Sequence, residues 1–456
     1  MRALLRNGIR RSELMNTAKR LETDSLGTVE IAASKLYGVH TQRAIQNFPR
    51  GGGKSLGDYP HLVTAMLRVK QACATTNREI GALCEEVENS ILASADLLIR
   101  DSRAGEFPIA SLHGGGGTSA NMNVNEVLAN MAEEALGGKR GEYRLVHPND
   151  HVNLNQSTND VYPTACRLAI LACLEELVPA HRKLDVAFVH AIDKWGEQSR
   201  LARTCLQDAV AITFSDFFNA YRGTLKRCID RITSSAEALH EVNLGGTICG
   251  RSSDVPSTYL ETVVGQLSTV TGNPKLRQGE NLFDAAQNAD DILAVSSALD
   301  LLARQLIKIS ADLRLLNSGP VGGIKEIDLP ATQAGSSIMP GKVNPVIPEY
   351  AMQLSMQTTG LHQASAAALA HAELDLNVWE SLITCNTLDM TGLLSTALTS
   401  LAESAVAGLE VLPANIQNHL ESPIARWTEL AKVRGYSKAT EQIQRALKQT
   451  GQEYQK

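Results

Sequence analysis

Apolar residues recur most regularly between Asn288 and Asn317. They alternate spacings of three and four residues, which is the pattern of a heptad seam along one face of a helix. The seam positions are Ile292, Val295, Leu299, Leu302, Leu306, Ile309, Leu313 and Leu316. Gly319 and Pro320 follow as a stop signal. A helix of this length, about 45 Å, needs neighbours along its whole extent, so the pattern predicts a helical bundle.

Four further stretches have the length and composition of long helices. They cover residues 162–190, 214–242, 348–374 and 382–411. Together with the seam they predict a central long-helix domain at residues 151–405, which carries a loop at residues 333–346. We expect a mixed and helical N-terminal domain at residues 1–150 and a small helical domain at residues 406–456.

The composition also favours a mostly helical, all-α fold. Aromatic residues make up only 4% of the 456 residues, and Ala and Leu dominate the apolar set, which favours helices over strands. The 43 Lys and Arg residues against 49 Asp and Glu residues give a formal charge of −6, which argues against a nucleic-acid or membrane surface. No stretch approaches the roughly 18 apolar residues that span a bilayer. We therefore expect a small-molecule partner, without nucleic acid or membrane.

The cysteines and the start of the chain bear on its location. Eight cysteines are scattered without a CxxC pair, so we expect free thiols in a reducing, cytoplasmic compartment. The first twenty residues are basic, but Glu13 interrupts them and no apolar signal-peptide core follows. A frayed tail, or translation from Met15, is the interpretation that we favour, and an organelle transit peptide is the alternative.

Four polar segments interrupt the helical pattern, and the first runs from His113 to Val127. Its four consecutive glycines, residues 114–117, leave backbone N–H groups uncovered, and Thr118 with Ser119 is expected to cap the helix that follows. Such a helix N-terminus binds anions. The segment lacks the Lys of a phosphate-binding loop, so we predict an anion cradle, with a flexible turn as the alternative.

The second segment, His147 to Asp160, holds hardly any apolar residue although an apolar helix follows it. So many hydrogen-bonding side chains indicate recognition of a polar ligand rather than core packing. His147 and His151 lie four residues apart, but Pro148 and the Asn149-Asp150 turn disfavour a helical zinc pair, and we expect no metal.

The third segment is Thr204 to Ala209. Its Cys205 is a candidate thiolate nucleophile, but no basic partner lies near it in the sequence, so we favour a buried, inert thiol. The fourth segment is GSSIMPGKVNP, Gly335 to Pro345, and its two Gly and two Pro residues exclude a helix. It mixes apolar residues with two hydroxyls, one cation and one amide. This composition predicts a mobile lid that closes polar groups over a small ligand.

GSSIMPGKVNP resembles the signature loop of the aspartase/fumarase superfamily, and the other segments resemble that superfamily's characteristic regions in the same order. The resemblance extends to LGTVEIAASKLYGVHTQRAIQNF near the start and to LNVWE, Leu376 to Glu380, so it covers roughly residues 20–410. It implies a mostly α-helical subunit of three domains and a homotetramer with each active site shared by three subunits. The implied reaction is a reversible elimination that releases fumarate, and we expect no cofactor.

Site residues follow by position in the matching motifs. Ser336 resembles the family's catalytic base, and Lys342 and Asn344 resemble residues that bind a substrate carboxylate. The candidate substrate-binding residues are Thr118, Ser119, Ser157, Thr158, Asn159, Thr204, Cys205 and Met339. A secondary anion site of the hydratase branch is matched by His147, Asn149 and Asp150.

The branch within the family is indicated by HGGGGTS, LQDAV, PVIPE and the Glu380 of LNVWE, all similar to aspartate ammonia-lyases rather than to fumarases. Cys205 departs from both branches. Fumarases have a His there, which pairs with the Glu that matches Glu349, and ammonia-lyases have His or Gln. A thiol neither carries a proton as imidazole does nor donates as an amide does, which disfavours hydration of fumarate. The C-terminal part also lacks the family's usual Asn-Pro turn.

The leading hypothesis is therefore an ammonia-lyase of amino acid metabolism that converts L-aspartate, or a close amino-substituted succinate, into fumarate. The proton next to one carboxylate is removed, and an aci-carboxylate intermediate forms. The alternatives are a fumarate-releasing lyase of a modified aspartate, a class II type fumarate hydratase and a non-catalytic helical scaffold. The retained Ser336, Lys342 and Asn344 argue against a scaffold.

Overall fold

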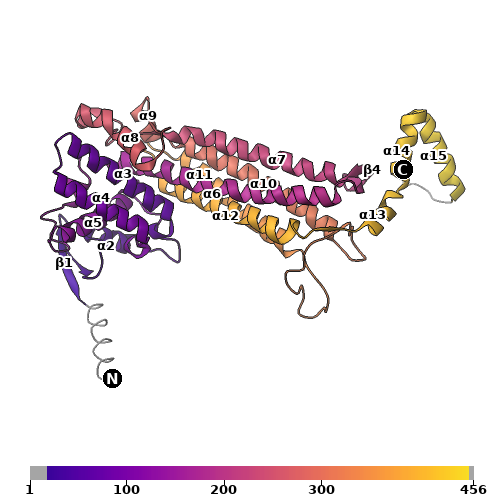
Figure 1. Ribbon diagram of the computed structural model, residues 1–456, viewed down its shortest axis with the longest axis horizontal. Helices are drawn as coiled ribbons and strands as arrows, with labels where there is room; N and C mark the ends of the chain where they lie inside the picture. The colour runs from indigo at the N-terminus through magenta and orange to yellow at the C-terminus, as the bar shows by residue number, and fades with distance from the viewer. Residues whose placement is uncertain (1–17, 451–456) are drawn as a thin grey trace, which may run out of the picture. The chain divides into compact units, whose positions relative to one another are not determined.

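The computed structural model describes residues 18–450 and is mostly helical, which confirms the predicted all-α class (Figure 1). The named strands in this range are short and form four two-stranded sheets. The chain divides into two compact units. The first comprises residues 18–176, 231–299 and 359–392, and the second comprises residues 177–230, 300–358 and 393–450. The three-domain division stays a prediction.

The first unit begins with a hairpin in which β1 (Lys19–Asp24) pairs antiparallel with β2 (Gly27–Ala32). Its shorter helices are α2 (Val39–Asn47), α3 (Pro60–Glu79), α4 (Glu85–Asp101), α5 (Thr118–Ala135), α8 (Ser257–Thr271) and α9 (Leu282–Gln287). Helix α3 packs against α4 and α8, and α5 packs against α2 and α4 (Figure 1). The packed faces bury apolar side chains, with Leu62, Met66 and Leu128 fully buried, and they also bury polar ones such as Lys70 and Glu126.

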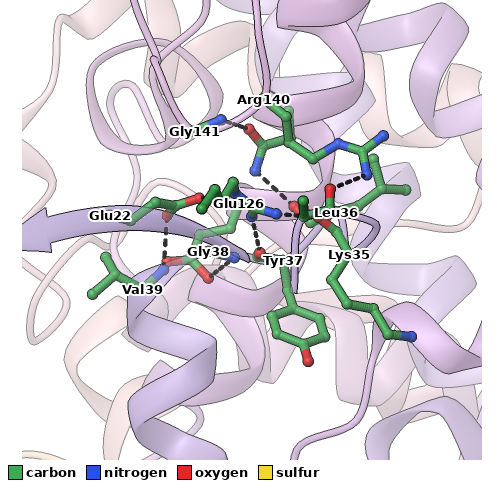
Figure 2. Close-up of polar contacts among 12 residues, drawn as sticks. Glu22, Lys35, Leu36, Tyr37, Gly38, Val39, Glu126, Arg140 and Gly141 are labelled. Carbon is green, nitrogen blue, oxygen red and sulfur yellow. Dashed lines mark hydrogen bonds and ion pairs between the residues drawn. The ribbon is translucent and has the colours of Figure 1, made fainter. Parts of the chain in front are cut away.

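The buried carboxylate of Glu126 on α5 fixes the start of α2 (Figure 2). It accepts hydrogen bonds from the backbone N–H groups of Gly38 (2.8 Å), His40 (2.7 Å) and Thr41 (3.1 Å), and from the Thr41 hydroxyl (2.6 Å). Burial raises the pKa of Glu126 to about 7, and these hydrogen bonds act in the opposite direction. Because the first N–H groups of a helix have no partner within it, Glu126 supplies what α2 lacks.

The five longest helices are α6 (Thr158–Trp195), α7 (Phe214–Ala236), α10 (Asp290–Asn317), α11 (Val346–Ala370) and α12 (Glu380–Leu401). They overlap the predicted stretches. Helix α6 extends beyond residues 162–190 at both ends, α11 ends before residue 374, and the largest differences are at the ends of two other helices. The helix predicted to reach residue 242 ends at Ala236, because residues 237–240 form a 3₁₀ turn and Glu241–Val242 forms β5, which pairs with β6 (Arg277–Gln278). The helix predicted to reach residue 411 ends at Leu401, where a π-helical turn begins.

The heptad seam of α10 is buried inside the chain. None of its eight side chains is more than 4% exposed. The seam therefore belongs to the subunit's own core, as the bundle prediction requires. The large apolar side chains that α10 exposes lie off the seam, at Leu301 (45% exposed) and Leu315 (44% exposed).

The second unit contains a hairpin of β3 (Ser199–Thr204) and β4 (Gln207–Thr213) and three C-terminal helices. The helices are α13 (Pro413–Leu420), α14 (Pro423–Arg434) and α15 (Tyr436–Thr450). Helix α13 packs against β3, and α14 packs against β4 and α15. The short strand β7 (Ile327–Asp328) pairs with β8 (Glu410–Val411). The C-terminal helices are thus tied to the hairpin that carries the third polar segment.

A single buried carboxylate, that of Glu326, joins three parts of the second unit. Two residues of β3 contact it: Nε of Arg200 lies 3.2 Å from the carboxylate, and a guanidinium nitrogen of Arg203 lies 2.8 Å from it. Nδ1 of His419, on α13, lies 2.9 Å from it. The Arg200 guanidinium also lies over the ring of Phe217, 4.4 Å from its centroid. Buried charges persist only when they are paired, so the hairpin, the segment before the lid and α13 are held together.

Two expectations from the sequence concern the basic N-terminal segment and membrane-spanning helices. The basic N-terminal segment lies outside the described residues, apart from its last few positions. No helix in the part of the chain that the structure describes is both long and apolar enough to cross a membrane.

We predict that Glu126→Ala lowers the free energy of unfolding by about 3 kcal/mol or more, since several buried donors lose their acceptor. Chemical denaturation of the purified protein measures this. The matched control is Glu134→Ala on the same helix, whose carboxylate pairs with Arg140 near the surface at 2.8 Å. That change should cost about 1 kcal/mol or less. Equal losses in the two variants would contradict the role of Glu126.

Candidate active site

The first two polar segments meet in the first unit. Thr118 is the first residue of α5, and Thr158 is the first residue of α6. The side-chain amide of Asn121, one turn into α5, donates to the Thr158 hydroxyl at 3.0 Å. Two segments that lie about forty residues apart in the sequence are therefore joined at the starts of α5 and α6, as expected of a shared binding site.

The glycine run adopts a backbone that other residues rarely take. Gly115, Gly116 and Gly117 have φ values of +90°, +58° and +92°. A Cβ on Gly117 would lie 2.5 Å from the ring of Tyr162, and one on Gly116 would lie 3.2 Å from Cδ2 of Leu376. Only glycine fits these positions. The contact with Leu376 also brings the LNVWE segment beside the glycine run.

The predicted capping role of Thr118 and Ser119 is wrong. The N-cap of α5 is Gly117, which carries no side chain, and Thr118 is already helical. The Thr118 hydroxyl instead donates to the carbonyl oxygen of Gly115 at 2.8 Å. Because no side chain caps this helix, its first N–H groups keep the capacity to bind an anion. The anion cradle itself stays a prediction.

The buried carboxylate of Asp160 fixes the segment 157–160 by hydrogen bonds to the backbone. It accepts from the backbone N–H groups of Ser157 (2.9 Å), Gly245 (3.0 Å) and Thr247 (3.2 Å). Burial raises the pKa of Asp160 to about 6, and the three hydrogen bonds act to lower it. The segment around Gly245 was missed in the sequence analysis, although its cluster of glycines between residues 244 and 250 was a signal for a tight turn.

The orientation of the Asn159 amide is fixed by that same loop. Its Nδ2 donates to the carbonyl oxygen of Ile248 at 2.6 Å. A carbonyl oxygen only accepts, so the nitrogen of the amide must face it. The side-chain oxygen of Asn159 is then the atom that can meet a ligand. An amide oxygen accepts hydrogen bonds and therefore suits a ligand group that donates them.

The candidate secondary anion site forms a π-helical turn, Pro148–Val152. His147 Nδ1 accepts from the backbone N–H groups of Asn149 (3.2 Å) and Asp150 (3.1 Å), and His151 Nδ1 accepts from the N–H of His147 (2.9 Å). These ring nitrogens serve the turn itself. Among residues 18–450, no group of three or more His, Cys, Asp or Glu side chains is arranged to hold a metal ion.

The lid residues lie together in the second unit. Ser336 Oγ accepts from the backbone N–H groups of Ile338 (3.2 Å) and Met339 (3.0 Å), while Lys342 Nζ donates to the side-chain oxygen of Asn344 at 2.6 Å. The backbone N–H of Gly335 donates to the carbonyl of Lys342 at 2.8 Å, which closes the loop at its base. The tip is exposed, with Ile338 at 83%. The loop predicted from the sequence is therefore present, and its own hydrogen bonds give it an internal structure.

The third segment forms the turn of the β3–β4 hairpin. Cys205 and Leu206 have φ values of +51° and +61°, as in a two-residue type I′ turn. Thr204 and Cys205 are both exposed, so the prediction of a buried thiol is wrong. The physical reason is the turn itself, which directs its side chains away from the packed elements. The sequence shows no Gly or Asn at these positions that would have revealed it.

Two acidic residues of the family motifs form ion pairs. Glu380 opens α12 and accepts from the buried Arg167 of α6 at 3.0 Å, and Arg167 also donates to Asp291 at the start of α10 at 2.7 Å. Burial raises the pKa of Glu380 to about 7, and Arg167 acts in the opposite direction. In the second unit, Glu349 pairs with Arg314 at 3.2 Å. Glu380 thus anchors the segment beside the glycine run.

The candidate residues therefore form two groups. The first unit carries the hydroxyl and amide cluster of Thr118, Ser119, Ser157, Thr158 and Asn159. The second unit carries the lid group of Ser336, Met339, Lys342 and Asn344 and the hairpin turn of Thr204 and Cys205. The hydrogen bonds described above order the start of α6 in the first unit and the lid loop in the second.

Comparisons with known proteins show the family of the chain. Residues 27–360 match the protein family described as Lyase. The chain is 42% identical over 422 residues to an aspartate ammonia-lyase from Pseudomonas canavaninivorans, which covers 92% of this chain and 89% of that protein. It is 41% identical over 396 residues to the aspartate ammonia-lyase of Escherichia coli K12, with 87% of this chain and 82% of that protein covered.

Solved structures of a fumarate lyase and a class II fumarase have a similar fold. The crystal structure of a fumarate lyase:delta crystallin from Brucella melitensis bound to cobalt superposes with a TM-score of 0.91 at 41% sequence identity, over 95% of this chain and 94% of that one. A class II fumarase from Schistosoma mansoni superposes with a TM-score of 0.90 at 30% identity, over 95% of this chain and 93% of that one.

Proposed function

The chain belongs to the lyase family, within the aspartase/fumarase superfamily, and we propose that it is an ammonia-lyase that eliminates ammonia from L-aspartate to give fumarate. A closely related amino-substituted succinate is the neighbouring possibility. The aspartate ammonia-lyases cover nearly the whole chain and are more similar to it in sequence than the class II fumarase is. This favours elimination of ammonia over hydration.

The observation that carries the proposal is the orientation of Asn159. Its nitrogen donates to the carbonyl of Ile248, so its oxygen is the atom left to accept from a ligand, and Ser157 and Thr158 precede it directly in the chain. A substrate ammonium has three N–H donors and no acceptor, and it needs such an oxygen. The hydroxyl groups, which can also donate, suit the neighbouring carboxylate. Together they match the ammonium and carboxylate of an amino acid.

Ser336 is proposed as the base that removes the proton from the carbon next to the carboxylate. A serine oxygen acts as a base only when negative charge on it is stabilised. The backbone N–H groups of Ile338 and Met339, at 3.2 and 3.0 Å from Oγ, provide that stabilisation. The electron pair of the broken C–H bond moves into the carboxylate and forms the aci-carboxylate, which Lys342 and Asn344 hold. Its collapse forms the double bond, and the C–N bond breaks to release ammonia.

The proposed enzyme is a homotetramer whose active sites are shared by three subunits. Large apolar side chains remain exposed on long helices of the second unit, namely Val178 and Val186 on α6, Leu301 and Leu315 on α10 and Met356 on α11. An exposed apolar face of this kind favours burial against another copy of the chain. In the tetramer, the lid of one subunit and the hydroxyl cluster of another would complete one site.

The proposed location is the cytoplasm, in amino acid metabolism. All eight cysteines lie within the described residues, and none of them forms a disulfide bond there. Free thiols that include the exposed Cys84 and Cys205 suit a reducing compartment.

Cys205 favours a second candidate, a fumarate-releasing lyase that acts on a modified aspartate. Its thiol is smaller than the His or Gln found there in the family and is a weaker donor. If the hairpin turn reaches the site of another subunit, the missing volume leaves room for a substituent on the substrate. The hairpin backbone does not depend on this side chain, since the turn carries it outward.

We predict that the purified protein produces fumarate from L-aspartate and not from L-malate, as followed by ultraviolet absorbance. Ser336→Ala should fold and assemble normally but lose at least about 99% of this turnover, because the base is removed. Ser337→Ala removes the neighbouring hydroxyl and should keep most of the activity. Turnover of malate alone would contradict the ammonia-lyase, whereas an active Ser336→Ala variant would contradict only the assignment of the base.

Shared sites predict that two inactive variants complement each other. Ser336→Ala and Thr158→Val chains, co-expressed with different tags and purified through both, should regain up to about a quarter of the wild-type activity, because some sites then combine two intact halves from different chains. The control is a mixture of the two separately purified variants without subunit exchange, which should stay inactive. Hybrids that form but show no activity would contradict the sharing of sites.

For Cys205, we predict that Cys205→His and Cys205→Gln raise kcat/KM for L-aspartate about fivefold to tenfold if aspartate is not the natural substrate, since a hydrogen-bond donor is restored. The same variants should lower kcat/KM for N-substituted aspartates because the free volume is filled. Unchanged values for both substrate types would remove Cys205 from the pocket and leave aspartate as the substrate.

A further inference from the structure

A lysine lies in the interior of the first unit, next to the proposed binding cluster but outside it. Lys70 is on α3, and its side chain is fully buried. Its Nζ donates to the side-chain oxygens of Asn153 at 2.9 Å and Gln156 at 2.8 Å. Both acceptors belong to the segment just before Ser157. A methionine would fill the same volume without burying a polar group, so packing alone does not explain a lysine here.

The hydrogen bonds of Lys70 continue to the binding cluster. The Asn153 side-chain oxygen accepts not only from Lys70 but also from the amides of Asn121 and Asn125, each at 3.1 Å. The same Asn121 amide donates to the Thr158 hydroxyl at 3.0 Å. The side-chain nitrogen of Asn153 donates to the carbonyl of Gln156 at 3.1 Å. A continuous chain of short polar contacts therefore runs from Lys70 to Thr158.

Lys70 and Asp160 hold the two ends of one segment. Lys70 binds the side chains of residues 153 and 156, and Asp160 binds the backbone of residues 157, 245 and 247. Burial lowers the pKa of Lys70 to about 7, and the nearby Asp160 carboxylate acts in the opposite direction. Either protonation state of the amine keeps at least two N–H donors for the two acceptors.

We propose that Lys70 is a positioning residue for the substrate-binding segment Ser157, Thr158 and Asn159. It does not touch the substrate. By holding Asn153 and Gln156, it fixes the start of α6 so that the hydroxyls and the Asn159 oxygen point at the ligand before it arrives. Preorganisation of this kind lowers the cost of binding. The kinetic test of this inference rests on the proposed function, whereas the structural test does not.

The kinetic test compares Lys70→Met with Gln71→Met. Gln71 is the next residue on α3 and is also buried, but its amide nitrogen contacts Leu92 and Asp96 of α4 instead of the binding segment. Lys70→Met should raise KM for L-aspartate about tenfold to a hundredfold with a smaller change in kcat, as expected for loss of hydrogen bonds to a charged group. Gln71→Met should leave KM within about twofold. An unchanged KM in folded Lys70→Met protein would overturn the proposal.

A second readout does not depend on the reaction. Amide hydrogen exchange of residues 153–160 should be faster in Lys70→Met than in Gln71→Met, even when both lose similar overall stability. If the wild-type protein shows no turnover of aspartate, the proposed function fails, and this exchange measurement alone decides the role of Lys70. Equal exchange in the two variants would overturn it.

If Lys70→Met does not fold, Asn121→Ala takes its place. This change removes the last link to Thr158 and leaves the buried lysine with both of its acceptors. It should raise KM in the same direction while the protein keeps its oligomeric state. A folded Asn121→Ala protein with wild-type KM would show that the chain of contacts has no influence on binding and would overturn the proposal.

Discussion

The cost of burying an unpaired charge or backbone N–H group is the constraint on which the rest of this structure depends. The functional segments are irregular, yet their backbones enter a helical scaffold that excludes water. The chain meets the constraint with buried carboxylates that accept several N–H groups at once. Glu126 serves the start of α2, Glu133 serves residues 144–146, and Asp160 serves three separate positions. Each one turns a loop into a fixed part of the fold.

The same device connects segments that are distant in the sequence. The Asp160 carboxylate joins the polar segment 147–160 to the glycine-rich turn near residue 245, and Arg167 joins the starts of α10 and α12. Glu326 does the same for the hairpin and α13 in the second unit. Removing one partner leaves the others charged and buried, so these links are costly to break. The lid is different, because the hydrogen bonds of Ser336, Lys342 and Asn344 stay within the loop. These internal bonds suit the proposed lid, which would move as one piece.

The sequence was sufficient for those features that depend on local pattern. The seam of α10 followed from its apolar spacing, and the irregular loop at residues 335–345 followed from its Gly and Pro content. What the sequence could not reveal depends on tertiary proximity. Lys70 and Asn153 are 83 residues apart, and Arg167 and Glu380 are 213 apart, so nothing local marks them as partners. The predicted cap at Thr118 was wrong for a related reason. Gly117 has a left-handed backbone and leaves room for the ring of Tyr162, and it is the N-cap, so the helix begins one residue earlier than the capping pattern suggests.

Residues that hold the backbone in place and residues that line the proposed site differ in how freely they can change. A residue that satisfies buried N–H groups, such as Asp160, or buried charges, such as Glu326, cannot change alone without leaving a partner unsatisfied. Cys205 sits on an exposed type I′ turn whose conformation is set by the hairpin, so its side chain can change at little cost to the fold. The backbone of the proposed site is therefore fixed by buried pairs, while the groups that line it remain open to substitution. A change of substrate would then require few residues, and we propose Cys205 as one of them.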